Sequence, residues 1–267
     1  MAEHNLLYQR AVYYDIALRR DVTPEIDFLL AVYEQRLGRP ARSALEIACG
    51  PAYHARALAR RGLNAFGLDL QPHMIAFAQE LAAADAVSVD LLVADMRRFE
   101  LPAPVDITFA LFDALDALVA NADLVQHWQC VAHNLTAGGL YIIDLTHPRD
   151  VSLTTYADFS YQGQRDGIAV EIAWATTPSR IDLVAGVAYT EVELRVTEQG
   201  EKKVMKDTAA ERLFVPQELQ LLADLSGELD VVSWYGDFNL NQPLDMSAQS
   251  RRMIVVCQKK TGGDPNE

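Results

Sequence analysis

Two apolar runs near the start of the chain each carry an acidic residue at the end, and this spacing indicates a nucleotide site. Glu46 lies in the first run and is followed by small residues up to Gly50, while Asp69 lies near the end of the second run, 23 residues later. An Ala-rich helical run separates them. Strand, tight turn, helix and strand make the first half of a mononucleotide-binding unit, with the second acid placed for ribose hydroxyls. The pattern predicts an adenosine-containing cofactor.

The elements that must position these acids alternate between strand and helix. Apolar runs predict strands over 45–48, 65–70, 89–94, 106–112 and 140–145, and helical spacing predicts helices over 53–61, 72–84 and 124–134. Such alternation is typical of a parallel sheet covered by helices on both faces. Residues 6–37 also have helical spacing, broken near Thr23-Pro24, where Thr23 can cap a second helix.

The pattern changes after His147-Pro148. Residues 168–174, 183–196 and 204–214 are rich in β-branched and aromatic residues without a helix between them, and turns are expected at 177–179 and 198–200. A helix over 216–225 and strands over 231–234 and 253–258 then resume the main domain.

The predicted fold is α/β: a Rossmann-like, seven-stranded, mostly parallel sheet with an antiparallel β insertion after strand 5. The expected organisation is an N-terminal helical cap over 1–40, a Rossmann-like domain over 41–150 and 213–260, the insertion over 151–212, and a disordered tail over 261–267.

Composition limits the partners. The 267 residues are half apolar, with a formal net charge of −14 and basic residues only in short pairs, which argues against nucleic acid. No apolar run approaches the roughly 20 residues that cross a membrane, and the N-terminus lacks a signal-peptide pattern. The three cysteines lie far apart and predict neither a metal site nor a disulfide. A cytoplasmic protein with a small-molecule partner is expected.

Beyond the first two acids, the order of motifs resembles the class I S-adenosylmethionine-dependent methyltransferases of the small-molecule type. The matches are Glu46, Ala48, Gly50 and Ala52 for the first motif, Asp69 after strand 2, Asp95-Met96 after strand 3, Gly138-Gly139 before strand 5, and the N-terminal Tyr14-Asp15. Ala52 departs from the family, which usually has Gly there. Either this position has ordinary backbone geometry or cofactor binding is compromised.

The resemblance implies S-adenosylmethionine as cofactor. It assigns cofactor binding to Tyr14, Glu46, Ala48, Gly50, His54, Asp69, Leu70, Asp95, Met96 and Phe112. Asp69 would accept both ribose hydroxyls and Asp95 the adenine amine. Glu46 would favour the cationic end of the methionyl group, and Tyr14 would lie over the sulfonium.

Methyl transfer requires mainly alignment, because the sulfonium is already activated, and a base is needed only for a protonated acceptor. Candidates for catalysis are His147, Tyr14 and Asp113, and candidates for acceptor binding are Tyr13, Asp116, Trp234 and Tyr235. Structural alternatives stay open: Asp113 as a helix cap, His147 as a structural imidazole, and the two later aromatic residues as core.

The predicted function is therefore methyl transfer to a small molecule, with nitrogen slightly ahead of oxygen because the chain is acidic. The insertion would cover the acceptor or form a homodimer contact. One alternative is a non-catalytic cofactor-binding protein with the same fold. A nicotinamide-dependent oxidoreductase is less favoured, because Gly50 stands alone where such enzymes have G-x-G-x-x-G.

Overall fold

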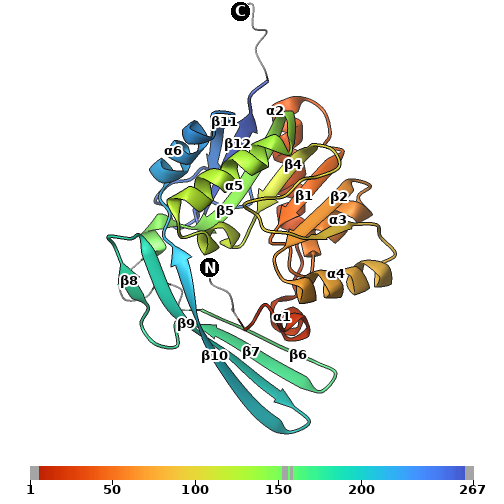
Figure 1. Ribbon diagram of the computed structural model, residues 1–267, viewed down its shortest axis with the longest axis vertical. Coiled ribbons are helices and arrows are strands. Elements are labelled where there is room, and N and C mark those ends of the chain that lie inside the picture. The colour runs from red at the N-terminus through yellow and green to blue at the C-terminus, as the bar shows by residue number, and fades with distance from the viewer. Residues whose placement is uncertain (1–5, 152–155, 157–158, 262–267) are drawn as a thin grey trace, which may run out of the picture.

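A seven-stranded sheet forms the centre of the protein in the computed structural model, which describes residues 6–151, 156 and 159–261 (Figure 1). Its order is β11-β12-β5-β4-β1-β2-β3. The strands are β1 (Ser43–Ile47), β2 (Asn64–Asp69), β3 (Asp90–Val93), β4 (Val105–Ala110), β5 (Leu135–Thr146), β11 (Leu229–Tyr235) and β12 (Arg252–Lys259). The first five pair in parallel, whereas β12 is antiparallel to both β5 and β11. The predicted Rossmann-like, mostly parallel sheet is confirmed.

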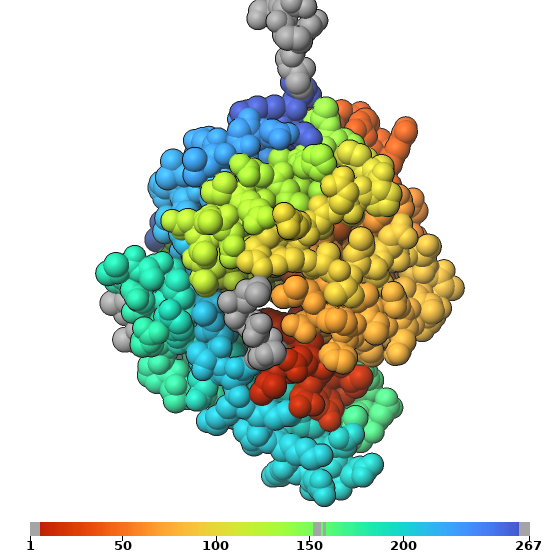
Figure 2. All heavy atoms as spheres, viewed as in Figure 1, coloured from red at the N-terminus to blue at the C-terminus, as the bar shows by residue number. Residues whose placement is uncertain are grey.

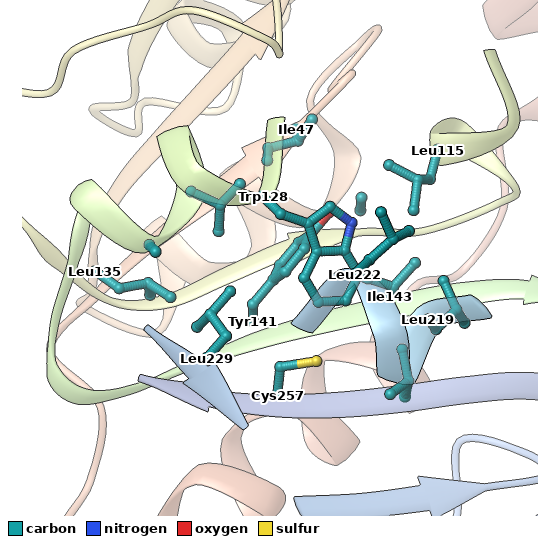
Figure 3. Packing of buried hydrophobic residues seen from close by; sticks show 14 of the residues in the cluster. Ile47, Leu115, Trp128, Leu135, Tyr141, Ile143, Leu219, Leu222, Leu229 and Cys257 are labelled. Carbon is teal, nitrogen blue, oxygen red and sulfur yellow. The ribbon is translucent and has the colours of Figure 1, made fainter. Parts of the chain in front are cut away.

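Helices cover both faces of this sheet. They are α2 (Thr23–Leu37), α3 (Tyr53–Arg60), α4 (Pro72–Ala84), α5 (Asn121–His133) and α6 (Pro216–Ser226), with short 3-10 helices η1 (Ala114–Ala117) and η2 (Pro148–Asp150). One core lies under α5 and α6, where the Trp128 and Tyr141 rings meet edge to face at 5.5 Å (Figure 3). The other lies under α2, α3 and α4. No helix within the described ranges combines the length and apolarity needed to span a bilayer.

A second, antiparallel sheet follows β5 and η2 in the chain. It comprises β6 (Ser160–Arg165), β7 (Ile168–Trp174), β8 (Arg180–Asp182), β9 (Val187–Glu198) and β10 (Glu201–Arg212). The expected insertion had three strands; β6 and β8 were missed because β6 is almost entirely polar and β8 is very short. The predicted turn after Glu198 is a two-residue hairpin loop, with φ 52 at Gln199 and 82 at Gly200.

The first helix, α1 (Ala11–Leu18), packs on the second sheet rather than on the main one (Figure 1). The contact is close: a Cβ added to Gly163 of β6 would lie 1.9 Å from the carbonyl oxygen of Ile16. The two helices of the predicted N-terminal cap therefore belong to different cores. Of the predicted tail, residues 262–267 lie outside the described part of the chain.

Candidate active site

The turn between β1 and α3 lies at the carboxyl edge of the main sheet, where the strand order reverses between β1 and β4. Ala48, Gly50 and Ala52 all have positive φ, at 52, 49 and 55. The expectation that Ala52 could have ordinary backbone geometry is wrong, since it is left-handed with a fully buried methyl group. Left-handed backbone costs a non-glycine residue about 1 kcal/mol or more, and such strain is concentrated at functional sites.

Asp69 ties this turn to the end of β2. Its carboxylate accepts hydrogen bonds of 2.8 Å from the backbone N–H of Gly50 and of Gln71. Burial raises the pKa of Asp69, although these two amide bonds oppose the change. The neighbouring Leu70 is 57% exposed. Asp69 thus fixes the Gly50 turn and still has lone pairs that a ligand could use. The exposed Leu70 provides an apolar surface beside it.

The segment that carries the predicted adenine contacts, Asp95 and Met96, is joined to α5 by hydrogen bonds. Asp95 is paired with Arg97, whose hydrogen bonds lower the pKa of the Asp95 carboxyl. The carbonyl oxygen of Met96 lies 2.8 Å from Nδ1 of His127, and Nε2 of the same ring lies 2.6 Å from the Tyr141 hydroxyl. His127 was not singled out from the sequence, yet it anchors the segment after β3.

Both carboxylate oxygens of Glu46 contact polar groups in the first turn of α3. One carboxylate oxygen lies 2.8 Å from Nδ1 of His54, and the other accepts a 2.8 Å hydrogen bond from the backbone N–H of Ala55. Both side chains are buried. Glu46 and His54 therefore form one buried pair beside the predicted cofactor turn, and any effect of Glu46 on the cofactor would involve His54 as well.

Tyr14 of α1 reaches over the cofactor turn. A Cβ on Gly50 would lie 3.9 Å from Cε1 of Tyr14, and the Tyr14 ring lies 5.9 Å from that of Tyr8. Burial, then the neighbouring Tyr14 and Asp116, raise the pKa of Tyr8. Figure 2 shows the surface hollowed here, between α1 in red and the orange and yellow segments of the main domain. Tyr8 and Tyr14 thus lie between the cofactor turn and a second group of residues, which includes Asp116 and Glu211.

That second group is acidic and lies where η1 meets β10. A cavity there is lined by Asp113, Asp116, Leu145, Thr146, Val151, Tyr156, Arg212, Leu213 and Phe214. Burial and the charge of Glu211 on β10 raise the pKa of Asp116 well above its usual range. Burial raises the pKa of Glu211 to about 7, and its Oε2 accepts a 3.0 Å hydrogen bond from Thr190. This arrangement can hold a cation or accept a proton.

Asp113 has a different role from Asp116. Its carboxylate accepts a hydrogen bond from the backbone N–H of Thr146 and pairs with Nη2 of Arg252 at 2.9 Å. Nε of Arg252 also binds Asp144 at 2.6 Å. This triad joins the ends of β4, β5 and β12. Phe112 and Asp113 have φ of 56 and 58, so β4 ends before the predicted residue 112.

The structure places the other predicted residues away from the acidic cavity. Nδ1 of His147 accepts a hydrogen bond from the N–H of Arg149 at 3.2 Å and Nε2 lies 2.9 Å from the Asp245 carbonyl oxygen, so both nitrogens are engaged. The remaining three are Tyr13, bound to Glu198 at 3.1 Å, Trp234, packed on the core under α5, and Tyr235, edge-on to Phe28 at 5.1 Å. None of these four lines the cavity.

Phe112 has an exposed ring at the end of β4, with the Arg20 guanidinium 4.1 Å from its centroid. Sequence reasoning missed Tyr8, Tyr156 and Glu211. Charged residues alternating along an insertion strand look like a solvated face. The available signal for Glu211 was its position at the end of β10, where the chain returns to the main domain.

Comparisons with known proteins bear on the domain and the fold. Residues 44–139 match the family model of the methyltransferase domain. A protein of Geobacillus sp. (strain WCH70) that carries the provisional name of methyltransferase is 28% identical over 105 residues, which are 39% of this chain and 42% of that protein. The chain therefore covers less than half the length of this curated relative.

Solved structures resemble nearly the whole chain. An S-adenosylmethionine-dependent methyltransferase from Clostridium acetobutylicum has a TM-score of 0.77 at 16% identity, covering 96% of this chain and 100% of that one. The sugar N-methyltransferase KedS8 from Streptoalloteichus sp. has a TM-score of 0.73 at 20% identity, covering 97% and 94%. At these identities the likeness establishes the fold.

Residues 44–139 thus match a methyltransferase domain, and nearly the whole chain has the fold of S-adenosylmethionine-dependent methyltransferases, in line with the resemblance that the sequence indicated. The cofactor of that class is S-adenosylmethionine. The residues present fit it: Asp69 at the end of β2 suits a ribose, the left-handed Gly50 turn lies against the Tyr14 ring without a close contact, and His54 keeps a buried nitrogen, Nε2, without a protein partner among the described residues.

Proposed function

We propose that this protein transfers the methyl group of S-adenosylmethionine to an amine nitrogen of a small molecule bound between the main sheet and the second sheet. The observation that carries this proposal is the acidic group where η1 meets β10: Asp116 lines the cavity there, and burial together with the charge of Glu211 on β10 raises the pKa of Asp116. Within the described ranges, neither carboxylate forms an ion pair with a protein cation. The ring of Tyr14 in α1 and that of Tyr8, which precedes the helix, connect this acidic group with the cofactor turn.

Charge and burial favour a cationic acceptor. Two neighbouring carboxylates removed from water repel each other, and a bound ammonium group would relieve this cost. Aromatic rings beside the acids, such as Tyr156, add a favourable surface for a cation. The described residues contain no cluster of His, Cys, Asp and Glu suited to a metal ion, so an organic cation fits better.

The names of structural neighbours agree with a nitrogen acceptor. KedS8 is described as a sugar N-methyltransferase, and CalS10 from Micromonospora echinaspora, solved with S-adenosylmethionine bound, as an amino pentose methyltransferase. MtfA, solved with sinefungin, is described as a glycopeptide N-methyltransferase. These descriptions support an amine acceptor for this chain as well.

Different residues of the chain bind the cofactor, bind the acceptor and remove its proton in this proposal. S-adenosylmethionine supplies a methyl group activated by its sulfonium. Asp69 would hold the ribose and Asp95 the adenine amine, while Tyr14 would cover the sulfonium. Asp116 binds the acceptor ammonium, and the Glu211 carboxylate takes its proton so that the nitrogen lone pair becomes available. His147 and Asp113 take no part in this scheme, because their polar atoms are engaged by other groups.

A screen with methyl-labelled S-adenosylmethionine tests the proposal. Primary and secondary amines should be methylated, while their hydroxyl counterparts should not; transfer to the hydroxyl series alone would contradict it. Glu211→Gln should lower kcat/KM at least about 100-fold, as expected when a base is lost. Glu201→Gln is the matched control, since Glu201 is exposed at the start of the same strand. Dimerisation through the insertion and a cytoplasmic location stay predictions.

A further inference from the structure

One buried imidazole nitrogen has no protein partner. His54 is only 4% exposed, yet its Nε2 forms no hydrogen bond with any residue that the structure describes. Its other nitrogen, Nδ1, lies 2.8 Å from Glu46. An unpaired polar atom in a buried position is costly, and so it indicates a missing partner.

Glu46 determines which nitrogen carries the proton. A carboxylate only accepts hydrogen bonds, so Nδ1 of His54 must donate, and Nε2 of the neutral ring presents a lone pair. The second oxygen of Glu46 is held by the backbone N–H of Ala55, which fixes the carboxylate in place. The buried Nε2 is therefore a preorganised hydrogen-bond acceptor.

The imidazole lies between the cofactor turn and the end of β4. His54 belongs to the first turn of α3, directly after the Ala48–Ala52 turn. Its ring centroid is 5.9 Å from that of Phe109, within β4, and 6.1 Å from that of Phe112, beyond the end of the strand. The acceptor nitrogen thus belongs to the carboxyl edge at which β1 and β4 adjoin.

We propose that Nε2 of His54 accepts a hydrogen bond from the α-ammonium group of the methionyl end of S-adenosylmethionine. This inference rests on the proposed function. The cofactor's other donors are the ribose hydroxyls and the adenine amine, which have their own candidate acceptors in Asp69 and Asp95. Glu46 then acts on the cofactor through His54: its negative charge strengthens the imidazole as an acceptor and favours the ammonium.

Two substitutions separate the nitrogens of His54. The amide nitrogen of His54→Asn can reach the position of Nδ1, which keeps the bond to Glu46 and removes the Nε2 position. The amide of His54→Gln can reach the position of Nε2. The ligands are S-adenosylhomocysteine and its deaminated analogue, which lacks the α-ammonium and keeps the carboxylate. Both affinities are measured by calorimetry on the full chain.

Wild type should bind S-adenosylhomocysteine at least about tenfold more tightly than the deaminated analogue, the scale of a hydrogen bond to a charged group. His54→Asn should remove this preference while binding the analogue as wild type does, and His54→Gln should retain part of it. A tenfold preference kept by His54→Asn, or an equal loss for both ligands, would overturn the inference. Wild type that binds S-adenosylhomocysteine without preference refutes only the role of His54, whereas wild type that binds neither ligand also refutes the proposed function.

Discussion

The buried carboxylate of Asp15 accepts a 2.7 Å hydrogen bond from the Tyr53 hydroxyl, which joins α1 to the first helix after the cofactor turn. Asp15 also pairs with Arg165 of β6 and with Arg19 of its own helix. Burial alone would raise the pKa of Asp15, but the hydrogen bonds from Arg165, Tyr53 and Arg19 outweigh it and lower the pKa. One carboxylate therefore connects α1, α3 and the second sheet, and it places the adjacent Tyr14 over Gly50.

Asp15→Asn should lower the free energy of unfolding by about 2 kcal/mol, because hydrogen bonds to a charged partner are lost with little change in volume. It should also raise the KM for the cofactor by displacing Tyr14. Urea denaturation and initial rates measure the two effects. Asp166→Asn is the control, since Asp166 is exposed beside the same Arg165. Equal behaviour of the two variants would show that Asp15 does not couple the elements.

Asp69→Ala should weaken S-adenosylhomocysteine binding at least about tenfold, because a bidentate, charge-assisted contact with the ribose is removed. The measurement is calorimetric titration. Asp90→Ala, at the exposed start of β3, provides the control. Because Asp69 also binds the N–H of Gly50, thermal unfolding without ligand should accompany the titration. An unchanged affinity for S-adenosylhomocysteine would show that Asp69 only accepts hydrogen bonds from the backbone of Gly50 and Gln71.

The stability of the fold should depend on pH through His127. Burial lowers the pKa of His127 to about 4 from an ordinary value of 6.5. The unfolded chain therefore binds a proton at a pH where the folded chain does not, and stability present above pH 6.5 is lost as pH falls towards 4. The loss should be about 3 kcal/mol in the free energy of unfolding.

Urea denaturation between pH 7 and 4 measures this loss, with His127→Gln expected to show a shallower decline. His133→Gln tests the specificity, because His133 is exposed near the end of the same helix. Identical declines in wild type and both variants would assign the acid sensitivity to other groups.

Activity should rise with pH through the titration of Glu211. Burial raises the pKa of this carboxyl to about 7, so it is protonated at low pH and becomes a base above neutrality. A plot of kcat/KM against pH, which reports on the free enzyme, should climb towards a plateau above pH 7 in wild type and in Glu201→Gln. Glu211→Gln should lose that inflection; its persistence would point to a different base.

Local patterns predicted the main domain well. Helix α4 begins at Pro72 and ends at Ala84, as its Pro-first, Ala-rich sequence indicated. The mostly parallel, seven-stranded sheet was predicted from the alternation of strands and helices together with the family resemblance, whereas the order of its strands was not predicted. The same local logic overextended β4, because the positive φ of Phe112 and Asp113 comes from their link to Asp144 and Arg252, which are distant in the sequence.

The sequence by itself determined the class of fold, the cofactor turn and the two acids that frame it, because each rests on neighbouring residues and a regular period. Only the tertiary structure decided what the polar side chains do. Asp116 comes under the influence of the Glu211 charge because β10 packs against η1, and Nε2 of His147 is engaged by the carbonyl oxygen of Asp245. Both relationships join residues more than 90 positions apart in the sequence, and no local periodicity encodes them. The acidic cavity proposed as the acceptor site is consequently a property of how β10 and η1 pack together.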